Sequence, residues 1–329
     1  MSTPESHHHQ HHQPHNRSHI QPIIRCSAGR GWLWWVEVFR LIKEAPGAWY
    51  RIGAGYFGIV LVILLPFMIV SIISKIDWVN HIGNLLFYVL APIFTVGFVA
   101  AAWTQVRGGA PKLSHLFSGF KADVKTLMGV GWTGAALFIL SVLIFFVLLG
   151  SDFVTQWQSF AKVNPGNADD PASAQAALDF LSMLVSPRLW LAILVFLTLA
   201  SMIWMAIWLA PMVVVFQRTG VVKAMQRSFM GVWINWRALS IWILSYFGVA
   251  FVAEIVLLIV IVPLFMLMAM GGAVGTTIAV ILLLMLCALI VPFLCCLMPL
   301  AAFVAYCDIF HAKDAVFPRP AKKKTISAP

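Results

Sequence analysis

Six apolar runs, each long enough to cross a lipid bilayer as a helix, dominate this sequence. A bilayer core of about 30 Å needs about 20 apolar residues at the rise of an α-helix. Of the 329 residues, 61% are hydrophobic and 10% are charged, whereas soluble proteins have about 25% charged residues. The sequence therefore predicts an all-α, polytopic membrane protein with six transmembrane helices. We expect these near Ala54 to Ser74, Asn84 to Thr104, Leu127 to Gly150, Leu189 to Phe216, Ala238 to Met270 and Val274 to Phe310.

Lysine and arginine residues fall mainly in alternate segments between these runs. The segment before the first run, the second and fourth loops and the segment after the last run hold 19 of the 22 basic residues. The positive-inside rule makes both termini and these two loops of the multi-pass protein cytoplasmic. We expect a His-rich tail at 1–29, a membrane domain at 30–312 and a basic tail at 313–329. No basic cluster on a soluble module points to nucleic acid as a partner.

The long third loop, external by this count, contains a helix signal. Asp170 can cap a helix, Pro171 suits its first position, and apolar residues follow at helical spacing as far as Ser186 and Pro187. The resulting helix either lies on the outer leaflet or packs over the mouth of the bundle.

A short motif recurs in the second, fourth and sixth runs, as Leu90-Ala91-Pro92, Leu209-Ala210-Pro211 and Leu297-Met298-Pro299. Each pair of runs also follows a stretch that mixes aromatic and basic residues, at 32–49, 113–132 and 221–236. We interpret this pattern as three parallel repeats, each an interfacial helix followed by a helical hairpin. Because proline removes one helical hydrogen bond, we expect kinks at Pro92, Pro211 and Pro299.

The first aromatic stretch has the pattern of a helix on a membrane surface. Trp32, Trp35, Phe39 and Ile42 share one helical face, and charged residues occupy the other. Three two-helix repeats also occur in mitochondrial carriers, whose odd-numbered helices carry proline followed by acidic and basic residues. That signature is missing here, since Pro66 precedes apolar residues and the third run has no proline.

Two segments carry a resemblance to a known family. These are the aromatic start Gly31-Trp32-Leu33-Trp34-Trp35 with Phe39 and Pro46, and Ala224-Met225-Gln226-Arg227-Ser228-Phe229 leading to Asn235-Trp236. Over about residues 30 to 310 the chain resembles a family of proteobacterial six-helix inner-membrane proteins of unknown function. More distantly, it is similar to the membrane domain of some glycerophosphodiester phosphodiesterases, without their catalytic domain. The resemblance implies a location in the bacterial inner membrane and a six-helix fold, and no particular chemistry.

Glu254 is the one ionisable side chain deep within a run. An ionised carboxylate at the bilayer centre costs about 2.5 to 3.5 kcal/mol on insertion scales, so such a group usually faces a cavity or the bundle interior. No lysine or arginine within a run can pair with it. Glu254 is therefore either a residue that handles protons or cations, or a neutral, hydrogen-bonded packing residue.

Histidine and cysteine residues provide the other candidate ligands. Seven of the ten histidines lie in the amino-terminal tail, where nothing fixes a coordination geometry, so we interpret the tail as a solvated low-complexity segment. Cys307, Asp308 and His311 share one helical face near the end of the last run, and we interpret them as a cluster at the water boundary. The five cysteines show no zinc spacing and no disulfide framework. We predict no metal site and no cofactor.

Two classes of function remain open from the sequence. The favoured one is a non-enzymatic membrane component that associates with lipid or with other membrane proteins, because the runs carry few polar groups and no nucleophile elbow, Walker loop, dinucleotide motif or zincin pair occurs. The alternative is a small-solute or proton-coupled transporter with Glu254 in a central cavity.

Overall fold

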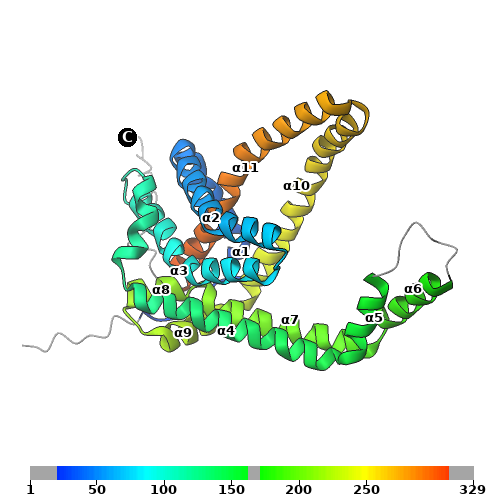
Figure 1. Cartoon of the computed structure of the whole chain (residues 1–329). Helices are drawn as coiled ribbons and strands as arrows, with labels where there is room; N and C mark the ends of the chain where they lie inside the picture. The colour runs from blue at the N-terminus through cyan, green and yellow to red at the C-terminus, as the bar shows by residue number, and fades with distance from the viewer. Residues whose placement is uncertain (1–20, 162–170, 311–329) are drawn as a thin grey trace, which may run out of the picture.

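The structure is a computed structural model, described for residues 21–161 and 171–310 (Figure 1). All regular elements in these ranges are helical, which confirms the predicted fold class. In chain order they are α1 (Arg30–Glu44), α2 (Pro46–Ser74), α3 (Trp78–Val106), the 3₁₀ helix η1 (Leu113–Lys121), α4 (Val124–Leu149), α5 (Ser151–Ala161), α6 (Pro171–Leu184), α7 (Pro187–Trp208), α8 (Ala210–Gln217), α9 (Val221–Ile234), α10 (Trp236–Met270) and α11 (Gly272–Ile309).

In the described ranges, six helical segments are long and apolar enough to span a membrane, as predicted: α2, α3, α4, α7 together with α8, α10 and α11. The first begins at Pro46 rather than at Ala54, because proline suits the first turn of a helix and needs no amide partner there. The carboxylate of Asp123 caps α4 by accepting hydrogen bonds from the hydroxyl and the amide of Thr126, and these bonds hold the pKa of Asp123 below its usual value.

The spanning helices pair into three hairpins, α2 with α3, α4 with α7, and α10 with α11. In Figure 1 the α4–α7 and α10–α11 hairpins diverge from a shared end, and α5 and α6 lie at the far end of the first of these. Much of the hairpins' surface consists of exposed leucine, isoleucine, valine and phenylalanine side chains. Such a surface suits contact with lipid chains.

The shared end of the hairpins, which we call the base, contains the main hydrophobic core. Buried side chains come from α1, the starts of α2, α4 and α10, the second half of α3, η1, α8, α9 and the end of α11. The helix α11 also packs along α2, so the last hairpin closes against the first. Gly53 marks the crossing, since a Cβ built on it would overlap the carbonyl oxygen of Pro292. A glycine at this position lets the two helices approach closely.

Short helices precede the first helix of each hairpin, at positions close to the predicted interfacial stretches. They are α1, η1 and α9, and η1 is a 3₁₀ helix. On α1, Trp32 and Phe39 of the predicted membrane face are about half exposed, at 51% and 47%, but Trp35 of the same predicted face is buried, so the prediction was wrong for this residue. A second face, with Trp34 and Val38, is fully buried in the base, and this face was not predicted. The threefold repeat itself stays a prediction.

The fourth span is interrupted, where the sequence predicted one continuous run. The amide of Leu209 donates to Ser228 Oγ at 3.0 Å, and Ser228 Oγ donates to the carbonyl of Met205 at 2.7 Å. In a continuous helix the amide of Leu209 would donate directly to the carbonyl of Met205, but here the Ser228 hydroxyl of α9 lies between them and bonds to both. Pro211 weakens the same turn, because it has no amide hydrogen to donate. By contrast, α3 continues through Pro92, and α11 through Pro292 and Pro299, so kinks at Pro92 and Pro299 stay predictions.

Replacement of Ser228 by alanine is expected to lower the free energy of unfolding by about 1–3 kcal/mol, because it leaves a buried amide and carbonyl without their shared partner. The matched control is Ser240→Ala, whose exposed hydroxyl only bonds the carbonyl of Trp236 in its own helix. Denaturant titration of the two variants in mild detergent measures the difference. Equal midpoints would show that the bridge through Ser228 contributes nothing.

Candidate functional site

The three prolines of the recurring motif meet at one cavity. Pro92 of α3, Pro211 of α8 and Pro299 of α11 all line a cavity of about 480 Å³, which we call the central cavity. Residues of α2, α4 and α7 complete its wall. All of the spanning helices except α10 therefore contribute residues to this cavity.

Each proline also removes a hydrogen-bond donor at the wall of this cavity. In a regular helix, the residue at the proline position would donate to the carbonyl four residues earlier. Those carbonyls belong to Tyr88, Ile207 and Cys295, and all three residues line the central cavity. The carbonyl of Ile207 accepts instead from the amide of Leu209, which this carbonyl shares with Ser228 Oγ. Backbone acceptors thus border an otherwise apolar space.

The side chains around the central cavity are mainly aliphatic and aromatic. The polar ones are the phenols Tyr56 and Tyr88, the hydroxyl of Thr95, the thiol of Cys295 and the indoles of Trp204 and Trp208. Among the described lining residues there is no carboxylate, amine, guanidinium or imidazole group. A pocket of this size with apolar walls and a few polar groups is typical of sites for small apolar molecules.

Glu254 lies elsewhere. Its side chain is exposed on α10, and it is not among the residues that line the central cavity. Within the described part of the chain, its carboxylate has no hydrogen-bond or ion-pair partner. The structure therefore does not bring Glu254 together with Pro92, Pro211 and Pro299, and any function of this residue stays a prediction.

A group of tryptophans joins α1, α7 and α10 beside the central cavity. Trp204 and Trp208 stack with ring centroids 4.7 Å apart, and Trp242 lies 5.2 Å from Trp208. Trp35 of α1 stacks on Trp242 at 5.4 Å and donates its indole N–H to the carbonyl of that residue. Aromatic packing of this kind stabilises a contact beyond the area that it buries. These tryptophan contacts pack α1 against α10, whose Trp242 in turn packs against α7.

An ion pair in the base was missed by the sequence analysis. Arg30 of α1 contacts Asp308 of α11 with Nη2 and Nε each 2.5 Å from Oδ2, and the indole of Trp34 donates to the same oxygen at 3.0 Å. The Asp308 side chain is 1% exposed. Asp308 is thus a buried structural residue rather than a member of a water-boundary cluster. Cys307 is also buried, and His311 lies outside the described residues.

Asn235, at the junction of α9 and α10, holds the segment that precedes α1. Its Oδ1 accepts from the amide of Cys26 at 2.6 Å, and its Nδ2 donates to the carbonyls of Ile24 and Gly231. The amide of Ile24 donates to the carbonyl of Ile309 at 2.8 Å. These bonds fix the start of the described chain against the end of α11, which is a structural rather than a chemical role.

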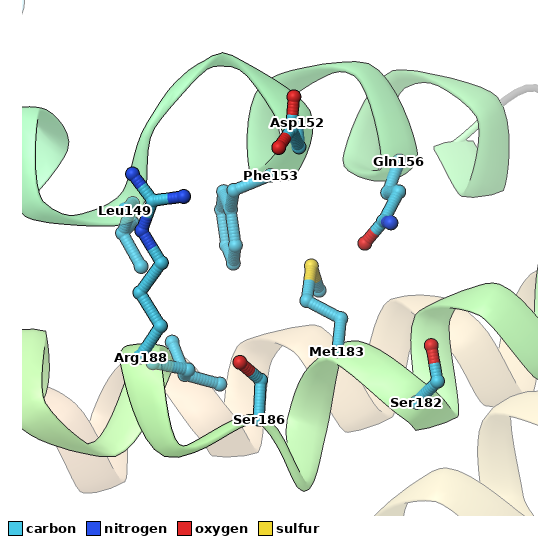
Figure 2. A pocket seen from close by; sticks show the side chains of 9 residues that line it. Leu149, Asp152, Phe153, Gln156, Ser182, Met183, Ser186 and Arg188 are labelled. Atoms are coloured by element: carbon cyan, nitrogen blue, oxygen red, sulfur yellow. The ribbon is translucent and has the colours of Figure 1, made fainter.

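A second pocket, of about 280 Å³, lies at the opposite end of the α4–α7 hairpin (Figure 2). Figure 2 shows Phe153 and Gln156 of α5 pointing across it toward Met183 and Ser186, with Asp152 at its edge. Of the two helices in this region, α6 was predicted from its cap signal, whereas α5 was not predicted.

The charged residue at one side of this pocket has a structural task. Arg188 Nε donates to the carbonyl of Leu148 at 2.7 Å and so neutralises the carboxyl end of α4. Gly150 follows with a φ of 77°, and a Cβ there would overlap the guanidinium of Arg188. Arg188 and Asp152 are both exposed, so the pocket is a solvated surface hollow.

Among the described residues, no group of three histidine, cysteine or carboxylate side chains could hold a metal ion. The His-rich tail lies outside these residues. No protein family, curated protein or solved structure matches the chain. The central cavity and the base therefore have to be interpreted from their own chemistry.

Proposed function

We propose that this protein is a non-enzymatic component of the bacterial inner membrane that acts by associating with lipid. The observation that supports this proposal is the central cavity, which lies between spanning helices and is lined by aliphatic and aromatic groups without a charged side chain. A site without carboxylate, amine, guanidinium or imidazole groups lacks the usual acids, bases and ion ligands of an enzyme or an ion transporter. Apolar molecules are what such walls bind best.

The lipid-facing surface gives additional support. The hairpins carry many exposed large apolar residues, and α1 exposes Trp32 and Phe39 beside its buried face. Tryptophan and phenylalanine at the edge of a membrane domain are typical of helices that lie in the headgroup region. We propose that α1 and α9 lie at the cytoplasmic surface, with both termini on that side.

Lipid retention by the purified full-length protein tests this function. We expect native mass spectrometry in mild detergent to show bound lipid, and Ala91→Phe, which fills the central cavity, to lower the retained amount by half or more. Ala273→Phe, at an exposed position at the start of α11, is the matched control and should retain lipid as the parent protein does. Equal retention by all three proteins, or no retention, would refute the proposal.

Glu254 separates this function from the transporter alternative. In proteoliposomes with an imposed pH gradient, we expect the parent protein and Glu254→Gln to give the same proton flux as empty vesicles, because the exposed carboxylate on α10 does not reach the central cavity. A flux that the parent protein carries and Glu254→Gln loses would favour a proton-coupled transporter instead.

The proposed orientation is tested separately from the function. Accessible-cysteine labelling or reporter tags placed after Pro329 and in the loop before α4 should be cytoplasmic, and one near Asn167 should be external, because 19 of the 22 basic residues lie in the segments assigned to the cytoplasm. An external carboxyl terminus would be incompatible with six crossings in this orientation.

A further inference from the structure

The central cavity contains hydrogen-bonding side chains that no protein group satisfies. The indole N–H of Trp208 is buried without a hydrogen-bond partner among the described residues, and the hydroxyls of Tyr56 and Tyr88 make no hydrogen bond to these residues either. The three side chains come from three different helices, α2, α3 and α7, and all of them line the same space. Each group can donate one hydrogen bond to an acceptor inside the cavity.

Unpaired donors are costly at this position because the cavity lies between membrane-spanning helices. Away from water, a hydroxyl or an N–H without a partner is disfavoured, because nothing replaces its hydrogen bonds to water. A ligand that brings acceptor oxygens would remove this cost. The three donors therefore point to a ligand with carbonyl or ether oxygens.

Acceptors border the same space. Pro92 and Pro299 cannot donate to the carbonyls of Tyr88 and Cys295, which are thereby left without their regular helical donor. A ligand hydroxyl could donate to either carbonyl. The ligand that suits both sets of groups has acceptor oxygens and at least one hydroxyl.

The charge and the size of the cavity restrict the ligand further. The described lining has no basic group to hold a phosphate or a carboxylate and no acidic group to hold an amine. The walls are mainly aliphatic and aromatic, and the volume of about 480 Å³ is in the range of sites for small molecules. Together these features describe the glycerol end of a neutral lipid with the adjoining part of its chains.

We propose that the central cavity binds a neutral glyceride, such as a diacylglycerol, whose ester carbonyls accept hydrogen bonds from Tyr56, Tyr88 or Trp208 and whose free hydroxyl donates to a carbonyl at the proline positions. This inference rests on the proposed association with lipid and specifies the class of lipid. A quinone offers acceptors alone, and a phospholipid or a fatty acid brings a charge that the cavity cannot neutralise.

The experiment uses a diacylglycerol with a photoactivatable diazirine in one acyl chain. The probe is incorporated with the full-length protein into nanodiscs of phosphatidylethanolamine and phosphatidylglycerol, irradiated, and located by peptide mass spectrometry. We expect labelled peptides from α3, α7 and α11 around the central cavity. Unlabelled diacylglycerol should compete, whereas a long-chain quinone and a fatty acid should compete at least tenfold less well.

Conservative variants test the hydrogen bonds. Tyr88→Phe and Tyr56→Phe remove only a hydroxyl, and each should weaken competition by unlabelled diacylglycerol about fivefold, the effect of one lost hydrogen bond. Tyr246→Phe makes the same change on α10, where the ring stacks on Trp35 outside the cavity, and should have no effect. Circular dichroism of all variants confirms that they remain folded.

Several results would overturn this proposal. Labelling spread over the outer surfaces of the hairpins, equal competition by quinone or fatty acid, or unchanged competition in the Tyr88→Phe and Tyr56→Phe double variant would each exclude a glyceride site. If phospholipid is retained in the native mass spectra while the probe does not label the cavity, the association with lipid stands and the glyceride proposal fails. Loss of all lipid retention would refute both.

Discussion

Replacing Gly53 by alanine is expected to lower the free energy of unfolding by at least about 3 kcal/mol, the upper end of the usual cost of overpacking. The added Cβ would overlap the backbone carbonyl of Pro292, and a backbone group cannot rotate away as a side chain can. The helices α2 and α11 would have to separate, and with them the first and last hairpins. Denaturant titration in detergent, monitored by circular dichroism, measures the loss.

Gly58 provides the control for this prediction. It lies on the same helix α2, but a Cβ built on it meets no atom within 4 Å. Gly58→Ala should therefore be neutral or slightly stabilising, because alanine has a higher helix propensity than glycine by about 1 kcal/mol. If both variants lost the same stability, the close crossing at Pro292 would not be the cause.

Replacing Asp308 by alanine should cost about 2–4 kcal/mol of stability, somewhat below the 3–5 kcal/mol usual for a broken buried pair, because Arg30 keeps 25% of its side chain exposed and can regain water. The change leaves the guanidinium of Arg30 and the buried indole of Trp34 without their shared acceptor. Asp308→Asn should lose less, since it retains an acceptor oxygen. Thermal unfolding in detergent, followed by tryptophan fluorescence, measures both variants.

The control for Asp308 is Asp77→Ala at the start of α3. Asp77 is exposed and makes no capping hydrogen bond with its side chain, so its removal should change the stability by less than about 0.5 kcal/mol. A similar loss for Asp77→Ala and Asp308→Ala would show that the carboxylate in the base has no special role.

The spanning helices could be predicted from the sequence because a long apolar run in a membrane has few alternatives to a helix. Their ends were less certain: Pro46 begins the first span eight residues before the predicted position of Ala54, since mixed aromatic residues precede the apolar run. The break at Leu209 could not be predicted, because it depends on the hydroxyl of Ser228 from a different helix.

The candidate site shows the same limit. Pro92, Pro211 and Pro299 could be selected from their recurring motif, but their meeting at one cavity depends on how three hairpins pack. The depth of Glu254 in its span could also be predicted. The side of α10 on which it lies could not, because α10 is apolar on all sides and its sequence has no helical periodicity that would distinguish a buried face. Asp308 was assigned to a local cluster because spacing along the chain cannot reveal a partner as distant as Arg30.

The contact between Arg30 and Asp308 also sets a limit on how early during synthesis the base can fold. The two residues are 278 positions apart, so ribosomal synthesis at about 5–20 residues per second separates their appearance by tens of seconds. During that interval, α1 has already been made, but the acceptor for Arg30 and Trp34 does not yet exist. The amino-terminal helix α1 therefore cannot reach its final contacts until the last span has been made and the base can close.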